Sequence, residues 1–358
     1  MSLDVLRVVA IFMVFGFHFP KVAGTSIFGP LARFGWIGVD LFFVLSGYLI
    51  GAQILKRVRS QEGFSYKAFY ISRFLRTLPV YFAVLAAYFL WDGFREKPMI
   101  APLWRFLTFT LNFEALDSAF SHAWSLCIEE QFYLVCPALL LVLTRIKSSR
   151  IGLLAASLLV VMGALYRHWT WLDFHSAMTP ENQWDIYLES IYYPTWGRLD
   201  GLIFGVLVAA IEQPRPEIWS VMSKHRAYTA ATGVVMFSAA IFLFMDRLSW
   251  SATVFGYPVL ALSFALLVMT AVSLKTNLSW LRKIGVGQLA ILSYSFYLIH
   301  KQVMHIVSTH WSFGSSDMDQ LAFAVTSFTA SLALSFLMYE LIERPFLMIR
   351  EKWLSLAE

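Results

Sequence analysis

Ten apolar segments, each close to the length of a bilayer-crossing helix, constrain this chain more than any other feature of its sequence. A helix needs about 20 mostly apolar residues to cross the hydrocarbon core of a membrane. Only 14% of the 358 residues are charged, against about 25% in soluble domains. We therefore predict an all-α, polytopic membrane protein with about ten transmembrane helices. The segments are residues 3–19, 36–55, 78–92, 123–143, 151–166, 196–212, 227–245, 251–273, 286–306 and 320–342.

Lysine and arginine residues between these segments predict the orientation of the chain. Cytoplasmic loops of membrane proteins are enriched in both residues. With the N-terminus inside, the inner loops hold 18 of them and the outer loops 7, so both termini are expected in the cytoplasm. This enrichment also accounts for the net charge of +5, which therefore predicts no nucleic-acid partner. Because no linker separates a second unit, residues 1–358 are expected to form one membrane-embedded domain without an appended soluble domain.

The first apolar segment carries one cation and one imidazole on the same helical stripe. Arg7 and His18 are eleven residues apart, so they nearly coincide in angle and lie roughly 16 Å apart along the axis. Ionisable residues in a membrane helix are costly and usually face a polar interior. We predict that this stripe forms one wall of an active site with Arg7 at the cytoplasmic end. His18 would lie near the outer end and is the strongest candidate for chemistry.

Further polar residues are expected at the outer depth of His18. Asp40 could orient or charge the imidazole, or it could simply cap the second helix. Ser125 and Glu129 share a face of the fourth helix, and Glu130 follows directly. Two adjacent carboxylates exceed what helix capping requires, so one of them is predicted to point into a polar cavity.

At the inner depth, Arg73 and Arg76 place two guanidinium groups on one helical face just before a segment. Such pairs bind phosphates through charge-assisted hydrogen bonds, although anchoring of the loop at the membrane surface is an alternative. Two glycine pairs predict close helix packing, namely Gly47 with Gly51 and Gly201 with Gly205. No spacing typical of a metal site or a nucleotide-binding glycine loop is present in the sequence.

The outer loop at residues 167–195 is rich in aromatic and acidic side chains. Aromatic rings combined with carboxylates suit a surface that contacts carbohydrate. An aromatic belt at the membrane interface explains the same composition equally well. Both interpretations stay open at the level of sequence.

Taken together, these motifs resemble those of the acyltransferase 3 family of integral membrane acyltransferases, and the resemblance covers nearly the whole chain. Each motif alone is weak, but their number and order are specific. They are Arg7 to His18, the Phe-Phe-x-Leu-Ser-Gly stretch at 42–47, Arg73-x-x-Arg76, Trp-Ser-Leu-x-x-Glu-Glu-Gln-Phe-Tyr at 124–133, Arg-Leu-Asp-Gly at 198–201, the stretch 293–300 that ends in His300, and Glu-Arg-Pro at 343–345.

The resemblance implies a multi-pass enzyme of the bacterial cytoplasmic (inner) membrane that works without a metal. It would move an acyl group, usually acetyl, from acyl-coenzyme A to a hydroxyl of a saccharide or lipid-linked saccharide. Residues expected to bind the coenzyme are Arg7, Arg73, Arg76 and Arg344. Residues expected to act in catalysis are His18, Asp40, Ser125, Glu129 and Glu130. Residues expected to bind the acceptor are Arg198, Asp200 and His300.

Two chemical routes are consistent with this implied activity. His18 would deprotonate the acceptor hydroxyl as a general base, or it would accept the acyl group itself as a nucleophile. Asp40 or Glu129 would stabilise the imidazolium in either route, and Ser125 would act as a hydrogen-bond donor. A proton-coupled secondary transporter of a small solute is the rival interpretation, since it also uses intramembrane His, Asp and Glu. A non-catalytic scaffold is a third.

Overall fold

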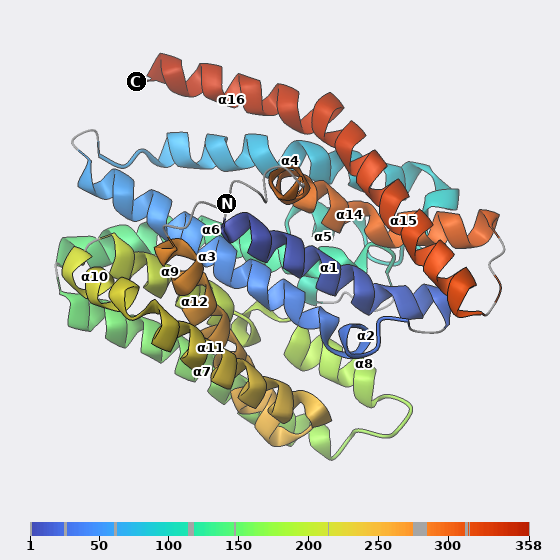
Figure 1. Cartoon of the computed structure of the whole chain (residues 1–358), viewed down its shortest axis with the longest axis horizontal. Helices are drawn as coiled ribbons and strands as arrows, with labels where there is room; N and C mark the ends of the chain where they lie inside the picture. Colours follow the sequence, from blue (N-terminus) through green and yellow to red (C-terminus); the bar gives the residue numbers. More distant parts are fainter. Residues whose placement is uncertain are drawn as a thin grey trace.

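The computed structural model shows long helices packed side by side (Figure 1). It describes residues 2–24, 27–60, 63–113, 118–146, 148–213, 215–274, 285–311, 314 and 316–357, and within these ranges the chain has no strand. Among these residues, eight helical stretches are long and apolar enough to cross a membrane. The predicted all-α polytopic membrane fold is therefore confirmed. The eight stretches are 2–23, 30–59, 66–90, 121–146, 150–175, 226–246, 252–273 and 317–355.

All ten predicted segments fall on helices, but two of these helices are not among the eight. Helix α9 (Asp200–Glu212) has 13 residues and is too short to span a bilayer. Helix α14 (Val286–His310) has 25 residues and carries His300 and Lys301. The other long helices are α1 (Ser2–Ala23), α3 (Gly38–Arg59), α4 (Tyr66–Leu90), α6 (Trp124–Ile146), α7 (Ser149–His175), α11 (Arg226–Leu243), α12 (Tyr257–Ser273) and α15 (Asp317–Met338).

Shorter elements connect or extend these helices. Three of them are π-helical turns, at Leu188–Tyr192, Ala252–Gly256 and Tyr339–Glu343. The last of these joins α15 to α16, so both belong to one long helical stretch. The short α-helices are α2 (Pro30–Phe34), α5 (Leu103–Leu107), α8 (Gln183–Tyr187), α10 (Pro216–Lys224) and α16 (Arg344–Ala357). The 3₁₀ turns are Gly35–Ile37, Asp92–Phe94, Leu111–Phe113, Ser121–Ala123, Thr195–Gly197 and Phe244–Asp246.

The glycine pairs do make the close helix contact that their spacing predicts. A Cβ atom on Gly47 would lie 2.1 Å from the Leu202 carbonyl oxygen, and one on Gly205 would lie 2.2 Å from that of Val44. Only a hydrogen atom fits at either position, so the backbones of α3 and α9 touch there. Helix α9 is therefore held against α3 although it is too short to span the membrane itself.

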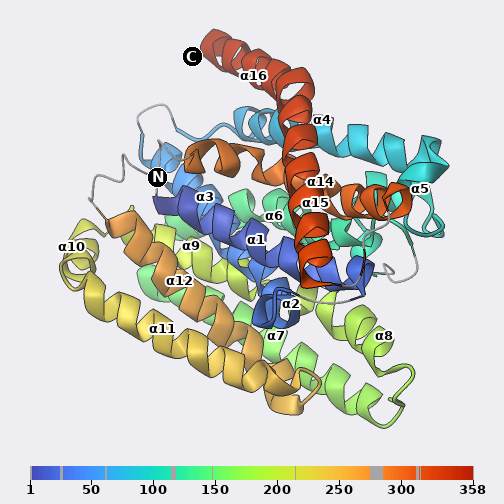
Figure 2. The ribbon, with the colours of Figure 1, turned by 45° about the vertical axis from the view of Figure 1, so that its right-hand side comes forward.

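Helices α1, α3 and α6 lie between two groups of helices, α7, α11 and α12 on one side and α4, α14 and α15 on the other (Figures 1 and 2). Both chain ends lie toward the same end of the molecule as α10 in the two views. Helix α10 belongs to a predicted inner loop. Four of the cations counted for the inner loops lie outside the described residues, namely Lys147, Lys275, Arg282 and Lys283.

One of the seven cations counted for the outer loops, Arg167, lies inside a helix. The apolar segment 151–166 predicts Arg167 in the outer loop, but α7 continues to His175. Arg167 is therefore inside the helix, and it is 0% exposed. Its Nη1 lies 2.7 Å from an Asp200 carboxylate oxygen and donates to the Gly197 carbonyl. This buried pair connects α7 to the start of α9. Removing one partner of such a pair typically costs about 3–5 kcal/mol of folding free energy, because the other charge stays buried.

Candidate active site

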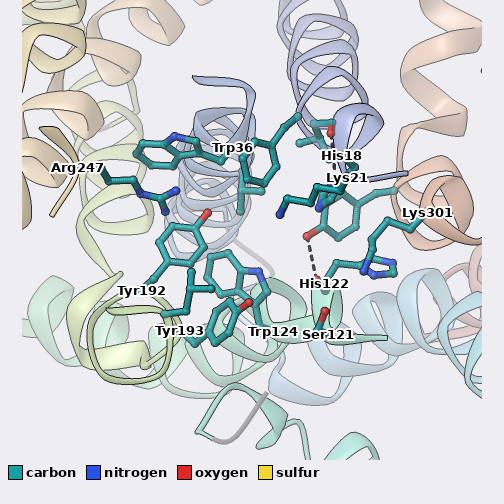
Figure 3. A pocket seen from close by; sticks show the side chains of 15 residues that line it. His18, Lys21, Trp36, Ser121, His122, Trp124, Tyr192, Tyr193, Arg247 and Lys301 are labelled. Carbon is teal, nitrogen blue, oxygen red and sulfur yellow. Dashed lines mark hydrogen bonds between the residues drawn. The ribbon is translucent and has the colours of Figure 1, made fainter. Parts of the chain in front are cut away.

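A cavity that is partly open to solvent lies where the ends of several helices meet (Figure 3). Its walls are aromatic and basic, and no carboxylate is among the described residues that line it. Burial raises the pKa of Tyr192 to about 12, so this phenol stays a neutral hydrogen-bonding group at physiological pH. The principal lining residues are His18, Lys21, Trp36, His122, Trp124, Tyr192, Tyr193, Arg247, Tyr297 and Lys301.

The hydrogen bonds around His18 determine which of its ring nitrogens is available for chemistry. His300 Nδ1 lies 2.8 Å from the Tyr297 carbonyl oxygen and 3.2 Å from that of Phe296, so it carries the hydrogen. The neutral ring then has its lone pair on Nε2, which lies 3.0 Å from His18 Nδ1. His18 Nδ1 must donate to it, and it is also 3.0 Å from the Val14 carbonyl oxygen. The lone pair of His18 is thereby assigned to Nε2, which bonds no described residue.

His122 is a third histidine of this group and was not among the residues predicted from the sequence. Its ring centroid lies 5.7 Å from that of His300. Nε2 donates to the Leu298 carbonyl oxygen at 3.0 Å, while Nδ1 is buried and bonds no described residue. The preceding Phe120 has a φ of 62°, a left-handed conformation that costs energy in a non-glycine residue. This strained turn positions Ser121 and His122 in the cavity wall. The signal in the sequence that could have identified His122 is its place just before the Trp-Ser-Leu motif at 124–126.

Asp40 does not contact His18, contrary to the predicted interaction. One oxygen of its buried carboxylate lies 2.9 Å from Arg198 Nη2, and the two form an ion pair between α3 and the start of α9. Neither Arg198 nor Asp200 lines the cavity, because each is held in a buried ion pair. Arg198 lies behind the cavity wall, with its guanidinium carbon 4.6 Å from the ring centroid of Tyr192. His18 has an imidazole rather than a carboxylate as its side-chain partner.

Glu129 and Glu130 are predicted at the outer depth and Arg73 at the inner depth, but Arg73 lies near both acids. Tyr133 donates to Glu129 at 2.6 Å, and the Arg73 guanidinium lies 4.2 Å from the centre of the Tyr133 ring. Thr77 donates to Glu130 at 3.2 Å. The predicted separation into an outer and an inner polar layer is therefore wrong for these two carboxylates. Side chains of α4 and α6 contact one another here, and Arg73 acts electrostatically on both acids.

Ser125 contributes through Tyr297. The Ser125 and Tyr297 hydroxyl oxygens lie 2.7 Å apart and share one hydrogen bond. Both hydroxyls also lie within hydrogen-bonding distance of the His122 carbonyl oxygen, Tyr297 at 2.9 Å and Ser125 at 3.5 Å. The role of Ser125 as a hydrogen-bond donor in catalysis stays a prediction. Tyr297 lines the cavity, whereas Ser125 is buried behind it.

A second basic group gathers near the start of α1. Arg7 and Arg73 both act electrostatically on Arg76. So does Arg350 of α16, which was not among the residues predicted from the sequence. Arg344 does not join them, because it pairs with Glu340 on the surface and its side chain is 54% exposed. None of these arginines lines the cavity around His18. The rise of α1 places Arg7 roughly 16 Å from His18.

Fold and cavity together define a multi-pass membrane protein with a histidine-centred site beneath a basic and aromatic cavity. A family model described as an acyltransferase domain matches residues 2–340. The chain therefore belongs to the acyltransferase 3 family, as its motifs predicted, and the predicted class of enzyme, an acyltransferase, is confirmed. This membership favours an enzyme over a transporter or a scaffold.

Several curated proteins are similar to the chain. It is 28% identical to peptidoglycan O-acetyltransferase OatA of Listeria monocytogenes, over 59% of this chain and 33% of that protein. It is 28% identical to a Staphylococcus aureus protein named "Putative O-acetyltransferase", over 96% of this chain and 57% of that protein. It is 31% identical to "Putative peptidoglycan O-acetyltransferase YrhL" of Bacillus subtilis, over 46% of this chain and 27% of that protein. The chain thus spans between about a quarter and three fifths of these relatives. No solved structure matches it.

Proposed function

We propose that this protein transfers an acyl group, most simply acetyl, from acyl-coenzyme A to a hydroxyl of a cell-envelope saccharide. The observation that carries the proposal is the hydrogen-bond chain that leaves His18 Nε2 with its lone pair at the cavity. The names of the relatives, two of which include peptidoglycan, support a saccharide acceptor. The distribution of Lys and Arg supports a bacterial cytoplasmic membrane location, with both termini inside and the cavity at the outer face.

The basic group near Arg7 is the proposed site for the coenzyme phosphates. Arg73 and Arg76 supply guanidinium groups that bind phosphate oxygens through charge-assisted, often bidentate hydrogen bonds. Arg350 is added to this set, since it acts on Arg76, whereas Arg344 lies outside it. From there the pantetheine arm would run alongside α1 and bring the thioester to His18.

The chemistry at His18 is written in two alternative forms. As a general base, Nε2 takes the proton of the acceptor hydroxyl while the hydroxyl oxygen attacks the thioester carbonyl carbon. The carbon–sulfur bond then breaks, and the departing coenzyme thiolate takes the proton from the imidazolium. As a nucleophile, Nε2 attacks the same carbon and expels the thiolate. The acceptor hydroxyl oxygen afterwards attacks the acyl carbon and releases the ring, and the proton of the hydroxyl passes to the coenzyme thiolate. In both forms His300 and the Val14 carbonyl hold the ring in place.

The test uses the purified full chain, acetyl-coenzyme A labelled in the acetyl group, and saccharide fragments of peptidoglycan as acceptors. The variant His18→Ala should transfer label about 10²- to 10⁴-fold more slowly, the usual contribution of a general acid–base group. The matched control His310→Ala alters an exposed histidine at the end of α14 and should transfer at the wild-type rate.

Rapid quenching distinguishes the two routes. Label attached to wild-type protein, absent from His18→Ala and discharged by acceptor, would establish the nucleophilic route. Transfer at the wild-type rate by His18→Ala would refute both.

A further inference from the structure

Arg247 is a cation that lines the cavity and has no role in the proposed acyl transfer. It follows the 3₁₀ turn Phe244–Asp246 at the end of α11 and lies across the cavity from His18, Lys21 and His122 (Figure 3). Its guanidinium carbon lies 3.9 Å from the ring centroid of Trp36 and 4.4 Å from that of Tyr192. Within the described chain, no carboxylate forms an ion pair with it. Aromatic faces therefore hold the plane of this guanidinium group without neutralising its charge.

One edge of the Arg247 guanidinium group is left without a hydrogen-bond acceptor. Nε and Nη2 are both buried, and neither bonds to an acceptor among the described residues. These two nitrogens direct parallel N–H groups to the same side, which matches the oxygen spacing of a carboxylate or phosphate. A buried donor without a partner costs about 1–3 kcal/mol, and more when it is charged. A bound anion would relieve that cost.

Lys21 supplies a second uncompensated charge to the same cavity. Its side chain is exposed and packs over the Phe17 ring, with the ammonium nitrogen 4.2 Å from the ring centroid. No carboxylate of the described chain forms an ion pair with it. Lys301, by contrast, is neutralised by Glu96 at 2.8 Å. Two cations without partners, in a cavity with no described carboxylate in its wall, favour an anionic occupant.

We infer that the acceptor saccharide carries an anionic group, a carboxylate or a phosphate, which the Nε and Nη2 edge of Arg247 binds. Lys21 adds the second charge, and a hydroxyl of the same saccharide faces His18. This inference rests on the proposed acyl transfer for the identity of the occupant as acceptor. The coenzyme phosphates are placed elsewhere, because Arg7 lies about 16 Å from His18 along α1. No arginine of its basic group lines the cavity.

The experiment measures binding in the full-chain variant His18→Ala without acetyl-coenzyme A, so that its outcome does not depend on turnover. Calorimetry would compare three disaccharides that differ only in their last sugar, which is glucuronic acid, glucose 6-phosphate or neutral glucose. We expect at least one acidic disaccharide to bind about 10- to 150-fold more tightly than the neutral one, the range for charge-assisted hydrogen bonds. The tighter of the two acidic disaccharides identifies the group as carboxylate or phosphate.

Substitutions assign this preference to residues. Adding Arg247→Gln should abolish the preference, and Lys21→Gln should reduce it without altering the aromatic surroundings of Arg247. The matched control is Arg105→Gln, because Arg105 also lies over an indole ring, at 5.1 Å from Trp104, but does not line the cavity. It should leave the preference unchanged.

Equal binding of all three disaccharides, or a preference that survives both Arg247→Gln and Lys21→Gln, would overturn the inference. So would loss of acetyl-coenzyme A binding in Arg247→Gln but not in Arg76→Gln, which would assign the site to the donor. A preference for acidic disaccharides in a protein that transfers no acyl group would leave the anion site standing and refute only the proposed reaction.

Discussion

Replacing His300 by phenylalanine separates a residue that positions the reacting group from the reacting group itself. His300 is fully buried and contributes one neutral hydrogen bond to His18 Nδ1, while the Val14 carbonyl contributes another. Loss of one such bond costs about 0.5–1.5 kcal/mol, which corresponds to a fall in kcat of about 2- to 13-fold. A ring of similar volume avoids opening a cavity. His300 was predicted to bind the acceptor, but it is buried and does not line the cavity, so both KM values should stay within about twofold of wild type.

The double variant His18→Ala/His300→Phe completes this test. If His300 acts only through His18, the double variant should be as slow as His18→Ala and no slower. The assay is transfer of labelled acetyl from acetyl-coenzyme A to saccharide by purified protein. A loss in His300→Phe as large as that in His18→Ala would make His300 a reacting group. Multiplication of the two single losses in the double variant would show independent roles. Either result refutes the hydrogen-bond chain.

Three further predictions concern the packing and the basic group. Gly205→Ala should lower the free energy of unfolding by about 1–3 kcal/mol, since its Cβ would lie 2.2 Å from a carbonyl oxygen of α3. Gly152→Ala, with nothing within 4 Å, should not destabilise, and thermal unfolding compares the two. Arg76→Gln should raise the KM for acetyl-coenzyme A several-fold while Arg344→Gln leaves it unchanged, as steady-state kinetics would show. Arg167→Met should cost about 3–5 kcal/mol of stability by isolating its carboxylate partner on α9, which chemical unfolding would measure.

The membrane fold was predictable from sequence because its signals are local. The length of an apolar segment and the 3.6-residue period of a helix are properties of neighbouring residues, so all ten segments fall on helices. The spacing of Gly47 and Gly205 with their partner glycines likewise indicated a close helix contact. The apolar segment 196–212 predicted a membrane-spanning helix, but α9 has only 13 residues. It is short because the chain before Asp200 forms a 3₁₀ turn rather than a further α-helical turn.

By itself, the sequence determined the class of protein, the positions of its helices, its family and the choice of His18 as the candidate for chemistry. Only the tertiary structure decided the partners of the charged and polar side chains. Asp40 pairs with Arg198 rather than His18, and the partner of His18 is His300, 282 residues away. Such pairs form where helices distant in sequence cross. Hydropathy and spacing predict that a polar group is buried and therefore needs a partner. They do not predict which helix supplies that partner.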